Sequence, residues 1–182
     1  MIDDISRVLL TKEQISVRVA QLGEEISENF HGKVPLFIGV LKGSFVFMAD
    51  LIRAVDLECS IDFMAVSSYG SGTESTGAVQ IRKDLDDNPS GRHLILVEDI
   101  LDSGMTLNYL VSYLSNQRPA SITVVTLLDK PARRKAPVEA RFVGFKVPDE
   151  FVVGYGLDYG EKYRNLPYIG ALKPEIYEGP QS

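Results

Sequence analysis

The residues best suited to chemistry lie in one run near the middle of the chain, from Val97 to Leu107. The run reads Val-Glu-Asp-Ile-Leu-Asp-Ser-Gly-Met-Thr-Leu and continues an apolar stretch that is typical of a buried strand. Its second half is a small, glycine-containing turn that opens a predicted helix. Free N–H groups at a helix start, together with the hydroxyls of Ser103 and Thr106, are donors for a phosphate. Gly104 lets the backbone come close to that anion, so the turn predicts a phosphate site.

Glu98 and Asp99 precede this turn, at the point where the predicted strand ends. Two carboxylates would repel a phosphate, so they need another partner. Carboxylates accept hydrogen bonds from a vicinal diol, and they also ligate Mg²⁺. Phosphate at one end, with a diol and a metal at the other, describes ribose 5-phosphate. The alternative is a solvated strand end that is followed by an ordinary helix start.

The run resembles the signature with which type I phosphoribosyltransferases bind 5-phosphoribosyl 1-pyrophosphate (PRPP). The rest of the chain looks like the bacterial hypoxanthine (hypoxanthine-guanine) phosphoribosyltransferases over nearly its full length. The matching segments follow the family order: Leu41–Ser44 for the pyrophosphate loop, Ser67–Gly70 for the lid, Leu128–Pro131 for the base-contacting loop, Pro148–Asp158 for the purine site, and Tyr163-Arg164. In this family the peptide before the lysine of the pyrophosphate loop is often cis.

The resemblance implies purine salvage, in which a nitrogen of hypoxanthine or guanine attacks C1 of PRPP and gives IMP or GMP with pyrophosphate and Mg²⁺. PRPP would be bound by Lys42, Gly43, Glu98, Asp99, Asp102, Ser103, Gly104, Met105, Thr106 and Arg164. The purine would be bound by Lys130, Phe151, Val152 and Asp158, the metal by Glu98, Asp99 and Asp158, and the lid would contribute Ser67 and Tyr69. Asp102 would act as the general base that accepts the N7 proton of the purine.

Several of these residues also have a simpler interpretation. Asp102 could cap the following helix through its side chain. Lys130 is otherwise a charge in a loop, and Phe151 and Val152 have the pattern of core strand residues. Asp158 is otherwise a surface ion-pair partner, as is Arg164.

The elements that must position this chemistry alternate between helices and strands. Thr11 and Gln14 form a capping box, and apolar residues at helical spacing follow as far as Phe30. A second helical pattern runs through Met48 to Val55, with Ser44 as a candidate cap. Strands are predicted at 34–41, 61–66, 79–81, 93–98 and 122–128, with further strands at 138–145 and 151–155 near the far side of the sheet.

This alternation predicts an α/β fold with a mostly parallel sheet that helices flank on both faces. The resemblance adds a small hood and a mobile lid loop, and it makes residues 1–182 a single phosphoribosyltransferase domain. Ligands of such sheets bind beyond the carboxyl ends of the strands. The loops at Lys42, Asp99–Thr106 and Lys130 should therefore share one face.

The composition narrows the classes of function. The chain has 182 residues, 24% of them charged, with a formal net charge of −6 and one cysteine. A large basic face for nucleic acid or membrane is not expected, and no apolar run approaches the ~20 residues of a membrane span. We expect a cytoplasmic homo-oligomer, a dimer or tetramer. The alternatives are a nucleotide-sensing regulator that binds RNA or DNA, and a transferase for another base such as xanthine or a pyrimidine; Lys130 with the segment 151–158 favours a 6-oxopurine.

Overall fold

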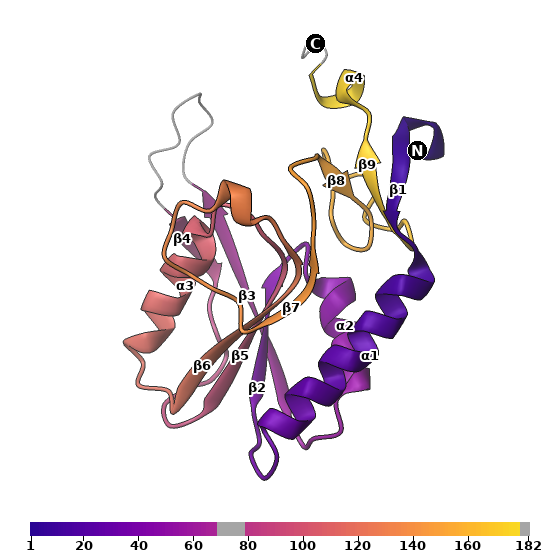
Figure 1. Cartoon of the computed structure of the whole chain (residues 1–182). Helices are drawn as coiled ribbons and strands as arrows, with labels where there is room; N and C mark the ends of the chain where they lie inside the picture. The colour runs from indigo at the N-terminus through magenta and orange to yellow at the C-terminus, as the bar shows by residue number, and fades with distance from the viewer. Residues whose placement is uncertain (69–78, 179–182) are drawn as a thin grey trace.

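A six-stranded sheet forms the centre of the protein (Figure 1). The computed structural model describes residues 1–68 and 79–178. The strand order is β4 (Val79–Lys83), β3 (Ser60–Ser68), β2 (Leu36–Leu41), β5 (His93–Leu101), β6 (Ser121–Asp129) and β7 (Phe142–Lys146). All neighbours pair in parallel except β4, which runs antiparallel to β3. The predicted α/β class with a mostly parallel sheet is therefore confirmed.

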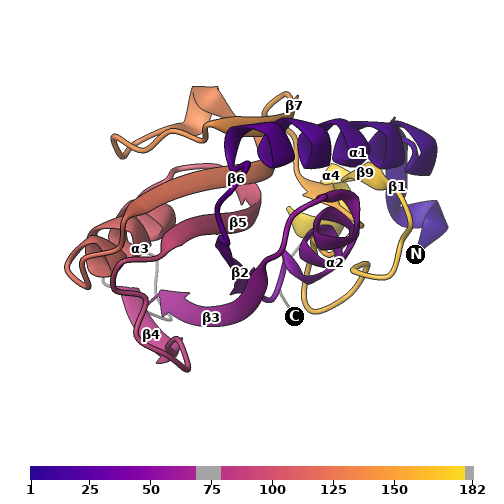
Figure 2. The same cartoon turned by 90° about the horizontal axis from the view of Figure 1, so that it is seen from below.

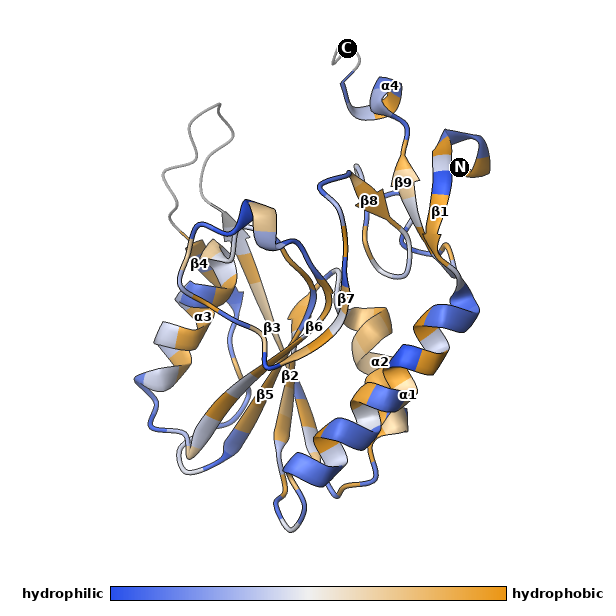
Figure 3. Cartoon of the chain, in the orientation of Figure 1, coloured by the Kyte–Doolittle hydropathy of each residue, from blue (hydrophilic) through white to orange (hydrophobic). Residues whose placement is uncertain are grey.

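Helices cover both faces of this sheet (Figures 1 and 2). Helices α1 (Lys12–Asn29) and α2 (Phe45–Ala54) pack on one face, and α3 (Met105–Ser115) packs on the other. Successive strand residues point to opposite faces, so Phe37 of β2 joins the α1 and α2 core while Ile38 joins the α3 core. Double-sided burial explains why the central strands are almost wholly apolar, as their orange colour in Figure 3 shows.

The N-terminus of α1 has the predicted capping box. Thr11 Oγ1 accepts a hydrogen bond from the backbone N–H of Gln14 at 3.2 Å, and Gln14 Oε1 accepts one from the N–H of Thr11 at 2.8 Å. Ser44 occupies the N-cap position of α2, as predicted, but its side chain forms no capping hydrogen bond. Its hydroxyl donates to the carbonyl of Val40 at 2.7 Å, because the fully buried side chain points back toward β2 rather than along α2.

A second, antiparallel sheet forms the hood above the carboxyl edge of the central sheet. It has the order β1 (Ile5–Leu10), β9 (Ile169–Leu172) and β8 (Val152–Val153). Three short helices complete the described chain: η1 (Ile2–Asp4), η2 (Pro131–Arg133) and α4 (Pro174–Tyr177). The expectation that 151–155 lies in the central sheet is wrong, because this segment pairs with β9 instead.

Two strands also have different bounds from those expected. β5 continues to Leu101, since Ile100 and Leu101 pair with Leu128 and Asp129 of β6. Glu98 and Asp99 therefore lie within a strand and not at its end. β7 begins only at Phe142. In the described part of the chain, no helix is long and apolar enough to cross a membrane.

Candidate active site

The loops that follow β2, β5 and β6 meet at the carboxyl edge of the sheet, as predicted. The backbone N–H of Lys130, after β6, donates to the carbonyl of Leu101 at the end of β5 at 3.0 Å. The carboxylate of Asp99, in β5, lies directly against Gly43 in the loop after β2. The peptide bond between Leu41 and Lys42 is cis. Parallel pairing thus brings together segments that are far apart in the sequence.

The acidic pair of β5 has one carboxylate oxygen without a hydrogen-bond partner among the described residues. Asp99 is 9% exposed, and its Oδ1 accepts the N–H of Ile100 at 2.8 Å. Glu98 Oε2 is buried, and none of the described residues donates to it. Burial raises the pKa of Glu98 well above its ordinary value, and the charge of Asp99 raises it further. Burial also raises the pKa of Asp99, against the opposing effect of the Arg164 charge.

The turn after β5 offers unused backbone donors. Within residues 1–68 and 79–178, nothing accepts the N–H groups of Asp102, Ser103 or Gly104. Gly104 has a φ of 78°, and a Cβ there would lie 2.7 Å from Cγ1 of Val138, so both conformation and space require glycine. The turn lines a cavity of about 260 Å³ together with Glu98, Asp99, Thr106 and residues of β2. Donors for an anion and acceptors for hydroxyls therefore share one cavity.

Asp102 does not cap the helix that follows it. The N-cap of α3 is Gly104, without a side-chain hydrogen bond, so the interpretation of Asp102 as a helix cap is wrong. Asp102 Oδ2 forms an ion pair with Arg133 at 3.3 Å, whereas Oδ1 is buried and has no partner among the described residues. Met105 begins α3 and is 45% exposed. Asp102 thus keeps one carboxylate oxygen available as an acceptor.

The residues expected around the purine come from β6, the hood and the segment between them. Lys130 is 5% exposed, and its Nζ donates to the carbonyl of Glu150 at 2.5 Å. Burial lowers the pKa of this ammonium. The Phe151 ring is 37% exposed and stacks on Tyr177 of α4 at 4.9 Å between centroids, so it is not a core residue. Val152, in contrast, packs in the core, as its pattern predicted.

A small ion-pair network joins the pyrophosphate loop to the segment after the hood strand β8. Lys42 Nζ lies 3.0 Å from Glu161 Oε2, and Arg164 Nη2 lies 2.9 Å from Asp158 Oδ1. Arg164 Nη1 also donates to the carbonyl of Gly156 at 2.7 Å. The ion-pair interpretation therefore holds for both Asp158 and Arg164. The described residues contain no group of three or more acidic, histidine or cysteine side chains that could hold a metal ion.

The two residues predicted for the lid are only partly covered by the structure. Ser67 lies in β3, and its hydroxyl accepts from Nε of Arg82 at 2.9 Å. Tyr69 lies outside the described residues.

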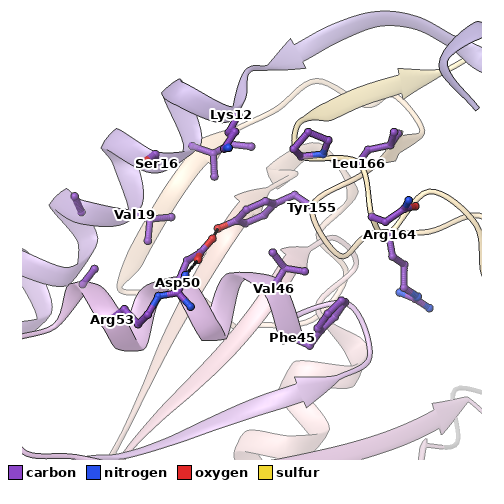
Figure 4. Close-up of a pocket in the computed structure, with 15 residues that line it drawn as sticks. Lys12, Ser16, Val19, Phe45, Val46, Asp50, Arg53, Tyr155, Arg164 and Leu166 are labelled. Atoms are coloured by element: carbon purple, nitrogen blue, oxygen red, sulfur yellow. Dashed lines mark hydrogen bonds and ion pairs between the residues drawn. The ribbon is translucent and has the colours of Figure 1, made fainter.

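A second, larger cavity of about 820 Å³ lies between α1, α2 and the segment 155–167 (Figure 4). The sequence did not predict it. The side chains of Tyr155 and Asp50 point toward one another across it, and Tyr155 Oη donates to Asp50 Oδ2 at 2.5 Å. Burial and this hydrogen bond raise the pKa of Tyr155. Arg164 lines this cavity as well. No local signal indicates the contact, because 105 positions separate the two residues.

The fold and the site together define an α/β protein with backbone donors for an anion and acidic acceptors at the carboxyl edge of a mostly parallel sheet. The family model for the phosphoribosyl transferase domain matches residues 8–160. The hypoxanthine-guanine phosphoribosyltransferase of Bacillus subtilis (strain 168) is 56% identical over 175 residues, which are 96% of this chain and 97% of that protein. A crystal structure of a hypoxanthine phosphoribosyltransferase from Staphylococcus aureus is 54% identical, with a TM-score of 0.94 over 97% of this chain and 96% of that one.

The chain therefore belongs to the phosphoribosyltransferase family, in its bacterial hypoxanthine-guanine branch. It is also 53% identical over 177 residues to the bifunctional protein TilS/HprT of Listeria monocytogenes serotype 4b (strain F2365). That match covers 97% of this chain but only 27% of the longer protein. The expected family and fold are confirmed by these comparisons.

Proposed function

We propose that this protein is a purine salvage enzyme that transfers the 5-phosphoribosyl group of PRPP to hypoxanthine or guanine. The products are IMP or GMP and pyrophosphate. The observation that carries the proposal is the combination of unused N–H groups at 102–104 with a buried acidic pair whose Glu98 Oε2 has no partner among the described residues. An anion and a diol, at opposite ends of one small molecule, are the ligand that such a site would bind.

PRPP would use both loops at this edge of the sheet. The 5-phosphate would bind the turn Asp102–Thr106, with Ser103, Gly104, Met105 and Thr106 as donors. The pyrophosphate would lie on the backbone amides of Lys42 and Gly43 and near Arg164, whose guanidinium is already close enough to Asp99 to influence its pKa. Negative charge on the ligand would thus meet amides and a cation, while its hydroxyls would meet carboxylates.

The acidic pair fits a divalent cation as well. Glu98 Oε2 is buried and lacks a partner among the described residues, and Mg²⁺ prefers oxygen ligands. Glu98 and Asp99 would hold the ion directly or through water, and Asp158 is the proposed ligand of a second ion. When bound, Mg²⁺ would neutralise charge on the leaving pyrophosphate. Because burial raises the pKa of both strand carboxyls, their ionisation and cation binding should favour each other.

The purine would lie between the turn after β5 and the hood. Lys130 would donate to the 6-oxo group, Phe151 would stack on the ring, and Val152 would offer backbone groups to the edge of the base. Asp102 would accept the N7 proton as the base attacks C1, through the carboxylate oxygen that has no partner among the described residues. The Lys130 ammonium already donates to the carbonyl of Glu150 at 2.5 Å. The 6-oxo group of the base would be a further acceptor for the same ammonium.

The test is a transfer assay with PRPP, Mg²⁺ and a panel of hypoxanthine, guanine, xanthine and adenine, in which nucleotide and pyrophosphate are quantified. We expect turnover with hypoxanthine or guanine and little with adenine, whose 6-amino group is a donor. If only xanthine is turned over, the substrate is xanthine and not hypoxanthine or guanine. No nucleotide from any base, together with no PRPP binding in calorimetry, would refute the proposal.

We further propose that the protein is a homo-oligomer, a dimer or tetramer, and that residues 1–182 act as one cytoplasmic domain. Phe45, at the start of α2, is 45% exposed beside the larger cavity, whose lining is mostly apolar. Exposed apolar patches of this kind mark interaction surfaces. Sedimentation velocity should give an oligomer that Phe45→Asp weakens. A wild-type monomer at every concentration tested would contradict this part of the proposal.

A further inference from the structure

The segment that follows β6 donates hydrogen bonds to three successive carbonyl groups, at the end of β5 and in the turn after it. The carbonyl of Leu101 accepts from the N–H of Lys130 at 3.0 Å and from Nη2 of Arg134 at 3.4 Å. The carbonyl of Asp102 accepts from Nε of Arg134 at 3.1 Å. The carbonyl of Ser103 accepts from the N–H groups of residues 135 and 136 at 2.9 and 3.1 Å. Residues 130–136 therefore hold one side of this turn.

The geometry of the peptide bond links these carbonyl contacts to the direction of the N–H groups in the phosphate site. In a planar trans peptide the C=O of one residue and the N–H of the next point in opposite directions. Carbonyls 101, 102 and 103 point toward residues 130–136, so the N–H groups of Asp102, Ser103 and Gly104 point away from them. These are the three N–H groups that no described residue accepts.

Among the groups that donate to these carbonyls, Arg134 is the only side chain, and it is itself held in place. Its side chain is 20% exposed, it forms an ion pair with Asp129, and Nη1 donates to the carbonyl of Val138 at 2.8 Å. Its Cδ also lies 3.0 Å from where a Cβ of Gly104 would be. The planar guanidinium thus fits the back of the turn with several directed N–H bonds, a geometry that a lysine ammonium does not reproduce.

We propose that Arg134 is a positioning residue for the phosphate site: it holds carbonyls 101 and 102 and so directs the backbone N–H groups toward the 5-phosphate of PRPP. This inference deepens the proposed function and rests on it. Arg134 does not touch the ligand itself. Its positive charge behind the carbonyl ends of the peptides also favours an anion at their N–H ends.

The chain contains a matched control. Arg18 is 22% exposed, and its guanidinium likewise donates to two consecutive carbonyls, Val143 at 2.8 Å and Gly144 at 3.1 Å, while pairing with Glu25 at 2.7 Å. It does so between α1 and β7, away from the phosphate turn. Arg18→Lys and Arg134→Lys remove the same kind of carbonyl contact and should lower the melting temperature to a similar degree.

The experiment measures Kd for ribose 5-phosphate by calorimetry, and kcat and KM for PRPP, in the wild type and in both variants. We expect Arg134→Lys to weaken ribose 5-phosphate binding and raise KM for PRPP by about 10- to 100-fold, with a smaller change in kcat, because the donors are misplaced. Arg18→Lys should bind as the wild type does. Asp129→Asn, which keeps Arg134 but removes its anchor, should show a smaller loss in the same direction and serves if Arg134→Lys does not fold.

The outcomes separate the inference from the function on which it rests. If the wild type binds ribose 5-phosphate and both Arg134→Lys and Asp129→Asn bind it with the same affinity, the positioning role is overturned and the proposed function stays intact. Equal losses in Arg134→Lys and Arg18→Lys would mean that destabilisation explains the effect, and would also overturn it. Absence of ribose 5-phosphate and PRPP binding in the wild type would overturn both.

Discussion

The carboxylate of Asp99 occupies the space that a side chain at position 43 would need. A Cβ built on Gly43 would lie 1.6 Å from Oδ2 of Asp99 and 2.6 Å from its Cγ, far inside the 3.0 Å that real Cβ atoms keep. The pyrophosphate loop after β2 and the acidic pair of β5 are therefore in direct contact, and only glycine permits it. This contact joins two sequence segments to which family resemblance had assigned separate parts of one ligand.

Gly43→Ala should accordingly displace the Asp99 carboxylate or the loop, and we expect kcat/KM for PRPP to fall by about 10²-fold, the usual cost of a misplacement near 1 Å. Steady-state kinetics at saturating purine measures this. Gly91→Ala is the control for general destabilisation: it strains a positive φ of 72°, a strain that Gly43→Ala does not introduce, and a Cβ there meets no atom within 4 Å. Similar kinetic losses in both variants would contradict the steric explanation.

Asp102→Asn should lower kcat by about 10²–10⁴-fold, the range for loss of one acid–base group, while PRPP still binds. The measurement is turnover of hypoxanthine at saturating PRPP, with calorimetry of PRPP binding beside it. Asp149→Asn is the matched variant, because Asp149 pairs with the same Arg133, at 2.9 Å. If both variants lose activity equally, the charge on Arg133 and not a proton acceptor at position 102 is responsible.

Lys130→Met should reduce kcat/KM for hypoxanthine by about 10- to 100-fold, since hydrogen bonds from charged donors contribute roughly 1.5–3 kcal/mol. The KM for PRPP should hardly change, because the residue faces the base in the proposed function. Methionine also fills the buried space that the alkyl chain of Lys130 occupies, so the core should tolerate the substitution. An unaltered preference for hypoxanthine over adenine would remove Lys130 from base recognition.

Glu98→Gln should stabilise the free protein at neutral and alkaline pH, because glutamine keeps the shape of the buried side chain but does not ionise, and burial opposes that ionisation. Burial favours the neutral form of the Glu98 carboxyl in the folded protein, and so it raises the pKa of this group. The stability that the neutral carboxyl contributes is therefore full below the ordinary pKa of 4.5, and it is lost as the pH rises through the pKa of the folded state. The difference in melting temperature between variant and wild type should therefore shrink toward zero in acid. Thermal unfolding from acid to alkaline pH measures it, and a variant that is less stable at neutral pH would contradict the assignment.

Side-chain types and their spacing were enough to predict the local and layered features of the protein. The capping box at Thr11, the buried strands of the central sheet and their alternation with helices follow from side-chain type at fixed spacing, because each reports a contact within a few residues or burial on a whole face. Family resemblance then assigned the site segments, and the comparisons bear out the family and the fold. The roles of individual residues remain predictions.

Contacts between distant segments could be seen only once the chain was folded. β8 joins the hood because it pairs with β9, and a strand of two residues carries no periodicity that would announce its partner. The contact of Gly43 with Asp99 and the hold of Arg134 on the turn after β5 depend on the parallel order of β2, β5 and β6. Parallel strands bring their carboxyl ends together across long crossovers, so the contacts that shape this site lie between residues that no local pattern connects.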